Sequence, residues 1–317
     1  MTTAENIKVP FLSKKKNVVI IAILYTFLWG SAFPLVKLCM KYFEISDNDQ
    51  ASKCLVAGIR FLLSGLLVSS LGKATKIKIL PANKTSYLWI IIYGILSTAL
   101  QYAFTYIGLS NMEGSKGAIY DQLCVFFILI FGGLCFNDDN LSFKKILGCI
   151  IGFIGIFLTS ASGLGFDFSL GGEGMMIMSA IVQAAAYLIA KRSAKTVNSF
   201  SLVGLGQTVG GALLCIFSLI FGGKILSVNV TAVLILIMLA GISASAYILS
   251  ILPLKFFPAT EIASFNLLIP IFGVIMSGII LQENIFKWNY PVALILISLG
   301  IFIINYSFKF KKTTIHS

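Results

Sequence analysis

The stretch Lys116–Phe136, KGAIYDQLCVFFILIFGGLCF, is long and apolar enough to cross a membrane as one helix. A membrane-spanning helix needs about 20 mainly apolar residues in a row. A polar group of Tyr120, Asp121 and Gln122 lies near the start of the stretch. A carboxylate at the centre of such a helix costs about 2.5–3.5 kcal/mol on insertion scales. We therefore expect Asp121 to face a cavity or a partner, with the rest of the chain forming a shell around it.

The whole composition indicates a membrane protein. Of the 317 residues, 58% are hydrophobic and 11% are charged, whereas about 25% are charged in an ordinary globular domain. The apolar runs are continuous over roughly 20 residues, unlike the alternating segments of about 10 residues found in membrane β-barrels. The sequence thus predicts an all-α membrane protein with ten transmembrane helices. Their expected limits are Val18–Val36, Ala51–Leu71, Tyr87–Gly108, Lys116–Phe136, Lys145–Ser162, Gly174–Ala190, Phe200–Gly222, Val230–Leu252, Ala259–Leu281 and Pro291–Phe308.

The basic residues predict an orientation. With the N-terminus inside, 17 of the 24 Lys and Arg residues fall in inside segments and five in outside loops. This bias follows the positive-inside rule, and it also accounts for the net charge of +12 without a nucleic-acid partner. We expect a multi-pass protein of the inner (plasma) membrane with cytoplasmic tails at residues 1–17 and 309–317. The fifth and sixth spans are short, which suggests tilted helices.

A shift of 145 residues aligns the chain with itself. It places Tyr102 on Tyr247 and Asp121 on Asn266, with further matches at Leu123 and Leu268, Phe127 and Phe272, and Gly133 and Gly278. Five spans per repeat is an odd number, so the second repeat enters the membrane from the opposite side. We expect two inverted five-helix repeats, residues 18–162 and 163–308, with the binding site near the midplane where they meet.

The chain resembles the EamA-type members of the drug/metabolite transporter superfamily. The motifs that carry the resemblance are Trp29-Gly30-Ser31-Ala32-Phe33, Arg60-Phe61, the stretch from Pro258 to Ala263, Leu268-Ile269-Pro270, Gln282-Glu283 and Leu299-Gly300. The resemblance implies a ten-helix transporter of small organic metabolites. The chain departs from the family pattern at Val125, where the family has proline, and at Asp121, where it has a small or hydroxyl residue.

Asp121 has two open interpretations. In one, it lines the central cavity and binds an amine-bearing or cationic substrate, or takes up a proton. In the other, it is a structural partner of Arg60 or Lys116, or lies near enough to the outer surface to stay hydrated.

The other candidates are polar or aromatic residues inside spans. Tyrosines and membrane amides often serve packing alone, but symmetry favours a role for Tyr102, Tyr247 and Asn266. The predicted substrate pathway comprises Asp121, Asn266, Tyr102, Tyr247, Gln122, Tyr120 and Trp29. Arg60 and Pro270 are expected to be structural or gating residues, and Pro270 to kink its helix.

The predicted function is secondary transport by alternating access, not catalysis. We expect an amino acid or another amine-bearing compound as substrate, with proton coupling or none, no cofactor or metal, and a monomer or homodimer in the bilayer. One alternative is a nucleotide-sugar or phosphate-ester antiporter, which needs several cavity cations where this core offers Arg60 and Lys37. The other is a membrane-embedded lipid-modifying transferase, which needs a second acidic or histidine motif beside Asp138-Asp139.

Overall fold

The computed structural model describes residues 15–306, apart from 82, 136–142, 160, 163–164, 226, 258, 267 and 286. Asp138, Asp139 and the C-terminal tail therefore lie outside the described residues. The first half contains α2 (Lys15–Tyr42), α3 (Gln50–Ala74), α4 (Lys84–Gly94), the π-helical turn η1 (Ile95–Leu100), α5 (Gln101–Ser110), α6 (Gly114–Tyr120), α7 (Leu123–Cys135) and α8 (Phe143–Leu158).

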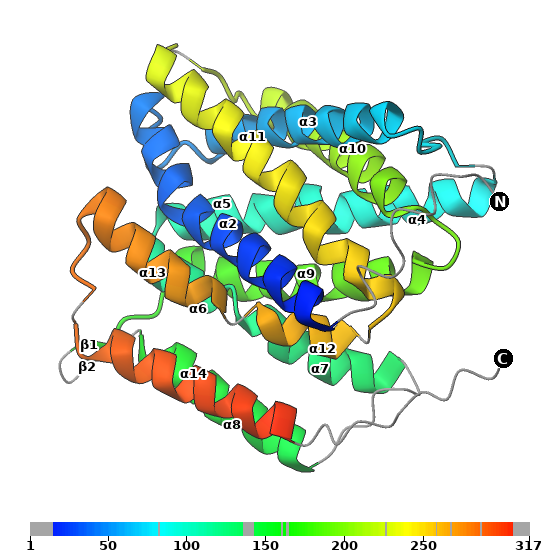
Figure 1. The fold of residues 1–317 in the computed structure, drawn as a ribbon. Helices are drawn as coiled ribbons and strands as arrows, with labels where there is room; N and C mark the ends of the chain where they lie inside the picture. Colours follow the sequence, from blue (N-terminus) through cyan, green and yellow to red (C-terminus); the bar gives the residue numbers. More distant parts are fainter. Residues whose placement is uncertain are drawn as a thin grey trace, which may run out of the picture.

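A two-stranded hairpin of β1 (Ala161–Ser162) and β2 (Gly165–Phe166) leads into the second half. This half contains the π-helical turn η2 (Leu170–Gly174), α9 (Met175–Ser193), α10 (Ser199–Ile220), α11 (Val230–Ile251), the 3-10 turn η3 (Leu252–Lys255), α12 (Ala259–Phe265), α13 (Leu268–Leu281) and α14 (Asn289–Tyr306). Five spans consist of consecutive pieces, namely α4–η1–α5, α6–α7, η2–α9, α11–η3 and α12–α13. With each of these counted once, the described elements form ten helical segments that alternate in direction across the bundle (Figure 1).

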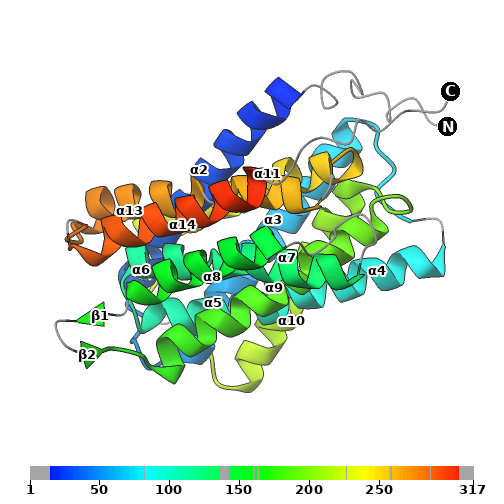
Figure 2. The same ribbon diagram turned by 90° about the horizontal axis from the view of Figure 1, so that it is seen from below.

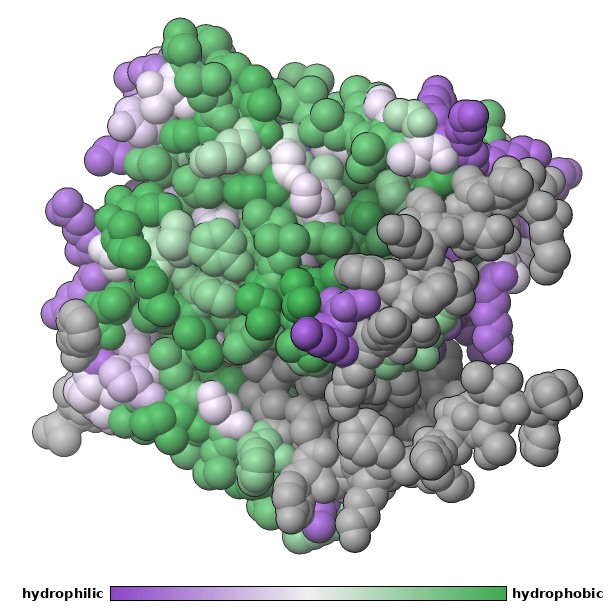
Figure 3. Space-filling view, in the orientation of Figure 1, coloured by the Kyte–Doolittle hydropathy of each residue, from purple (hydrophilic) through white to green (hydrophobic). Residues whose placement is uncertain are grey.

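The surface of the bundle is suited to lipid. Among the described residues, seven helical segments have the length and hydropathy of membrane spans, and three shorter apolar helices accompany them. Side chains such as Leu24 and Ile279 are at least half exposed on the outside of the bundle. Figure 3 shows apolar surface over the middle of one face and hydrophilic residues gathered toward its two ends. The protein is an all-α multi-pass membrane protein, apart from the short hairpin.

Polar caps explain where several helices begin. The side chains of Asn83, Asn198 and Asn229 each accept a hydrogen bond of 2.8 Å from a backbone N–H in the first turn of α4, α10 and α11. Such a cap satisfies one of the N–H groups that a helix start leaves without a partner. The caps lie at the ends of apolar runs, which is why most expected span limits fall close to the observed ones.

The fourth span is not the continuous helix that the sequence predicts. It divides into α6 and α7 at Asp121 and Gln122, which form a turn. The ninth span divides in the same way into α12 and α13 after Phe265. The end of α6 and the end of α12 lie 145 residues apart, the same shift that aligns the sequence. The sixth span also differs from the expectation, because η2 and α9 together give it 24 residues.

Proline is not required for a break of this kind. Pro270 is the third residue of α13, after the break, where the missing N–H would have no helical partner in any case. The first half breaks at the equivalent place although Val125 stands where Pro270 stands in the second half. The ninth span thus breaks just before Pro270, and the role of this proline stays a prediction.

The two broken spans cross each other near the centre of the bundle. Helix α6 packs on α13 and α7 packs on α12, so that the two breaks face each other across the interior. Helix α2 lies against both α11 and α13, while α8 and α14 pair at one edge of the bundle (Figure 1) and lie side by side in the foreground of Figure 2. Equivalent spans in the two halves run in opposite directions (Figure 1), as expected for an inverted repeat.

Candidate functional site

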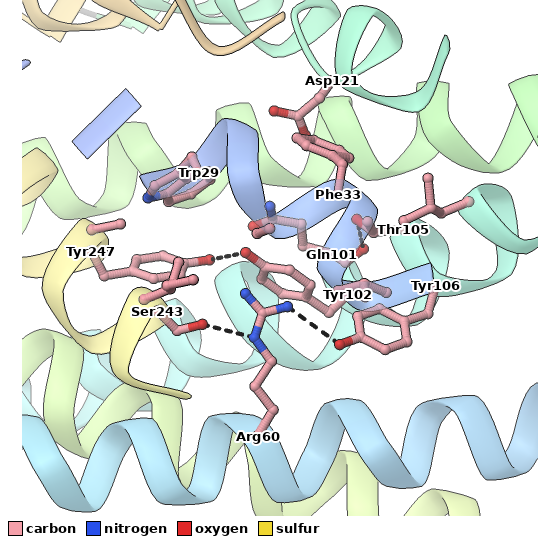
Figure 4. A pocket seen from close by; sticks show the side chains of 15 residues that line it. Trp29, Phe33, Arg60, Gln101, Tyr102, Thr105, Tyr106, Asp121, Ser243 and Tyr247 are labelled. Atoms are coloured by element: carbon pink, nitrogen blue, oxygen red, sulfur yellow. Dashed lines mark hydrogen bonds between the residues drawn. The ribbon is translucent and has the colours of Figure 1, made fainter. Parts of the chain in front are cut away.

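A small cavity, about 40 Å³ in volume, lies inside the bundle. Its walls come from α2, α3, α5, α11 and the break between α6 and α7. The lining residues are Trp29, Ala32, Phe33, Val36, Arg60, Gln101, Tyr102, Thr105, Tyr106, Leu109, Asp121, Ile242, Ser243, Ala246 and Tyr247 (Figure 4). We call this the first chamber.

Arg60 forms one wall of the first chamber. Its Nε donates to Ser243 Oγ at 2.8 Å and one terminal nitrogen donates to Tyr106 Oη at 3.3 Å. The guanidinium also lies over the rings of Phe61 and Tyr102, 4.9 and 5.7 Å from their centroids. An arginine side chain has five N–H donors, so some stay available to a ligand. Arg60 is only 3% exposed, and no carboxylate of the described chain pairs with it.

Asp121 lies on the opposite wall of the same chamber, with Phe33 and Tyr102 between it and Arg60 (Figure 4). It is the residue directly after α6 and is 6% exposed. Its side-chain hydrogen-bond partner is the amide of Gln183 on α9. Neither partner suggested by the sequence pairs with it: Arg60 binds hydroxyl groups, and Lys116 forms an ion pair with Glu173.

Two tyrosines from equivalent places in the halves meet at the edge of this chamber. The hydroxyl of Tyr247 donates to the carbonyl oxygen of Ser97 at 3.0 Å and lies 3.2 Å from the hydroxyl of Tyr102. Ser97 belongs to the π-helical turn η1, a type of turn that often marks functional sites. The ring of Trp29 packs on Tyr247 with centroids 5.0 Å apart. These rings form a partition inside the bundle.

A second small cavity, of about 30 Å³, lies on the other side of this partition. It shares Trp29, Gln101 and Tyr247 with the first chamber. Its other lining residues are Tyr25, Tyr93, Ser97, Cys124, Gln183, Ala186, Tyr187, Ser250, Ile251 and Asn266. We call it the second chamber.

The two chambers are related by the 145-residue shift. Asp121 in the first chamber corresponds to Asn266 in the second, and Thr105 corresponds to Ser250. The chambers differ in charge, because Arg60 and Asp121 both line the first, whereas the second has no charged residue among its described lining residues. The pseudo-symmetry thus produces two related spaces with different chemistry.

Acidic residues link the halves at the end of the bundle where α6 begins. Glu283 accepts hydrogen bonds from the backbone N–H groups of Gly114 and Ser115, at 2.8 and 3.0 Å. It therefore caps a helix of the other half. Glu113 binds Lys287 and Tyr290, and Lys116 binds Glu173.

Glu113 has a perturbed acidity at this end. Burial raises the pKa of Glu113, but the hydrogen bonds from Lys287 and Tyr290 outweigh burial and hold its pKa below the usual value. Glu113 is therefore ionised at neutral pH, and the link between the halves is charge-assisted.

The structure brings most of the predicted site residues together. Asp121, Tyr102, Tyr247, Trp29 and Arg60 line the first chamber, and Asn266 lines the second. The remaining predicted residues, Tyr120, Gln122 and Pro270, line neither chamber.

Tyr120 is instead buried beside Phe157, with ring centroids 5.9 Å apart. Sequence reasoning missed Gln101, Ser243 and Tyr187. The signal that identified Asp121, a polar side chain in an apolar run, was present for Gln101.

Two pseudo-symmetric chambers inside an inverted bundle define the class of multi-pass membrane transporter. The family model of the EamA-like transporter family matches residues 16–161 and 170–306. The chain belongs to the EamA-like transporter family.

The chain is similar to named relatives and to one solved structure. It is 27% identical over 313 residues to the uncharacterized transporter YvbV of Bacillus subtilis (strain 168), covering 95% of each chain. An uncharacterized transporter of Archaeoglobus fulgidus is 24% identical over 229 residues, covering 66% of this chain and 75% of the relative. A crystal structure superposes with a TM-score of 0.68 at 15% identity, covering 90% of this chain and 96% of the other. This last likeness concerns the fold alone.

Proposed function

We propose that this transporter carries a small zwitterionic metabolite, an amino acid, across the cytoplasmic membrane. The observation that carries the proposal is the placement of one buried cation and one buried anion on opposite walls of the first chamber, unpaired with each other. Charges held out of water need compensation. A zwitterion compensates both, with its carboxylate at Arg60 and its ammonium at Asp121.

The chemistry of each wall fits its end of the substrate. A guanidinium presents a planar fork of donors that matches a carboxylate, and Ser243 and Tyr106 hold this fork in place. The carboxylate of Asp121 accepts hydrogen bonds from an ammonium group. The rings of Trp29 and Tyr102 flank the space between, where cation–π contact adds to the binding of an ammonium group.

Transport follows from the two halves. We propose that residues 18–162 and 163–308 form the inverted repeats and that one rocks against the other around the chambers. The acidic links of Glu113 and Glu283 would hold one end closed and separate when that end opens. We further propose that this end faces outward, with both termini in the cytoplasm, as the distribution of basic residues indicates.

Energy coupling is the second part of the proposal. Asp121 is the candidate proton carrier, because the proton and the substrate ammonium compete for the same carboxylate. A phosphate-ester antiporter fits less well, since Arg60 is the only cation lining either described chamber and Lys37 donates to the Met112 carbonyl oxygen. A lipid-modifying transferase has less support, because both halves of the chain match the EamA-like transporter family.

Uptake into proteoliposomes tests this proposal. We expect a labelled amino acid to accumulate when a pH gradient is imposed or when unlabelled substrate is trapped inside. The matching amine without the carboxylate and the matching acid without the ammonium should each move at most a tenth as fast. If the amine alone moves as fast as the amino acid, Arg60 has no role in binding a carboxylate and the zwitterion proposal is wrong.

A further inference from the structure

We infer that the second chamber is a subsite for an uncharged group that both donates and accepts hydrogen bonds, supplied by the side chain of the substrate. This inference rests on the proposed amino-acid function and extends it to the choice among amino acids. The chamber is bounded by α2, α4, η1, α5, α7, α9, α11 and the break after α12.

Four buried polar atoms of residues that line this chamber lack a hydrogen-bond partner in the described chain. They are Trp29 Nε1, Gln183 Oε1, Tyr187 Oη and Asn266 Oδ1. Gln183 and Tyr187 are only 7% and 9% exposed. A buried polar atom without a partner is costly, and native structures rarely keep one. Four such atoms around one space therefore indicate a space that a polar ligand group fills.

The types of these atoms define the ligand. The indole of Trp29 can only donate, the oxygens of Gln183 and Asn266 can only accept, and the hydroxyl of Tyr187 does either. A single hydroxyl or carboxamide group satisfies donors and acceptors together. A charged group does not fit, because no charged residue of the described lining balances it.

The position of the chamber connects it to the charged one. Trp29, Gln101 and Tyr247 line both spaces, so a substrate held at Arg60 and Asp121 reaches the second chamber when these side chains move apart. Gln183 belongs to both sites: its side chain hydrogen-bonds to Asp121, and the residue lines the second chamber, with its oxygen left without a partner. Binding of the ammonium and of the side chain would therefore involve the same glutamine.

A bound water molecule would also supply a group that donates and accepts hydrogen bonds. Transport measurements on two amino acids distinguish water from a substrate side chain. Threonine and valine have nearly the same shape and differ by one hydroxyl group. In proteoliposomes, we expect the wild type to transport threonine more efficiently than valine, measured as kcat/KM. In Tyr187→Phe, which removes one hydroxyl from the chamber, the threonine-to-valine ratio should fall by about three- to tenfold, the range of one hydrogen bond.

Tyr87→Phe is the matched control, because Tyr87 is 42% exposed on α4 and lines neither chamber. Its ratio should equal that of the wild type. Asn266→Leu is a second variant, and it should lower the ratio in the same direction as Tyr187→Phe.

The possible failures are distinct. If the wild type transports threonine and valine equally well, or if the ratio is unchanged in both chamber variants, the second chamber holds water only and this inference is wrong. If the wild type transports no amino acid at all, the proposed function itself fails and the inference fails with it.

Discussion

The hydroxyl groups of Tyr102 and Tyr247 lie 3.2 Å apart, although 145 residues separate the two tyrosines in the chain. The same number of residues separates the two helix breaks. The pseudo-two-fold axis therefore passes close to this pair of hydroxyls. Each tyrosine lines the first chamber, and Tyr247 also lines the second. The pair is the place where the two repeats touch through equivalent residues.

This contact predicts coupling between the two tyrosines. Tyr102→Phe and Tyr247→Phe should each lower the free energy of unfolding in detergent, and the double variant should lower it by less than the sum. We expect a coupling energy of about 0.5–1.5 kcal/mol, typical of one hydrogen bond. Additive losses would show that the two hydroxyls do not interact.

Asp121→Asn should abolish transport of amine-bearing substrates while leaving insertion into the membrane intact. The amide keeps the shape of the carboxylate but loses the charge that binds an ammonium or a proton. Asp47→Asn is the control, because Asp47 is exposed in the loop after α2. Uptake by Asp121→Asn at the wild-type rate would remove Asp121 from the binding site.

Arg60→Lys should raise the KM for an amino acid by about tenfold or more, because hydrogen bonds to charged groups contribute roughly 1.5–3 kcal/mol. Lysine keeps the charge but lacks the fork that Ser243 and Tyr106 orient. The comparison is Arg192→Lys, an exposed arginine near the end of α9. An unchanged KM in Arg60→Lys would assign Arg60 a structural role only.

The Glu113 link predicts a dependence of stability on pH. The pKa of Glu113 lies below its usual 4.5, so the ionised form favours the linked state. The contribution is complete above pH 4.5 and is lost as the pH falls through the lowered pKa. The difference in Tm between wild type and Glu113→Gln should therefore be constant from pH 5 to 7 and shrink below pH 4.5. A difference that grows on acidification would contradict the link.

Gly210→Ala tests the close packing of α10 on the third span. An added Cβ would lie 2.3 Å from the carbonyl oxygen of Gly94 and 2.5 Å from Cβ of Thr98. Overpacking of this kind costs about 1–3 kcal/mol, so Tm should fall. Gly241→Ala is the matched control in α11, since its Cβ would meet no atom within 4 Å. Equal Tm values for the two variants would show that α10 and the third span can move apart to accept the added methyl group without a loss of stability.

The sequence allowed the ten spans to be predicted because their apolar runs are long and the charges fall between them. The helix breaks could not be predicted in the same way. Apolar residues flank both breaks, so each span still has the hydropathy of one continuous helix although α6 ends at Tyr120 and α12 at Phe265. Only the polar residues directly after these ends, Asp121 and Asn266, mark the positions.

The site was predictable to the extent that single residues stand out. Asp121 and Arg60 were identified because charge is rare inside spans, and Tyr102 and Tyr247 because the repeat pairs them. The partition and the second chamber were not, because they depend on how α2, η1, α9 and α11 pack. Tyr187 looks like an ordinary core tyrosine until its hydroxyl is found without a partner.

The unequal charge of the two chambers has a kinetic consequence. In a carrier with identical halves, the two sides of the membrane would be interchangeable, and substrate would enter from either side with the same KM and Vmax. Here Arg60 and Asp121 line only one of the two related spaces. The KM for influx should therefore differ from the KM for efflux, and the two Vmax values should differ as well. Without a coupled gradient, the ratio Vmax/KM must still be equal in both directions, because a passive carrier cannot create net flux at equilibrium.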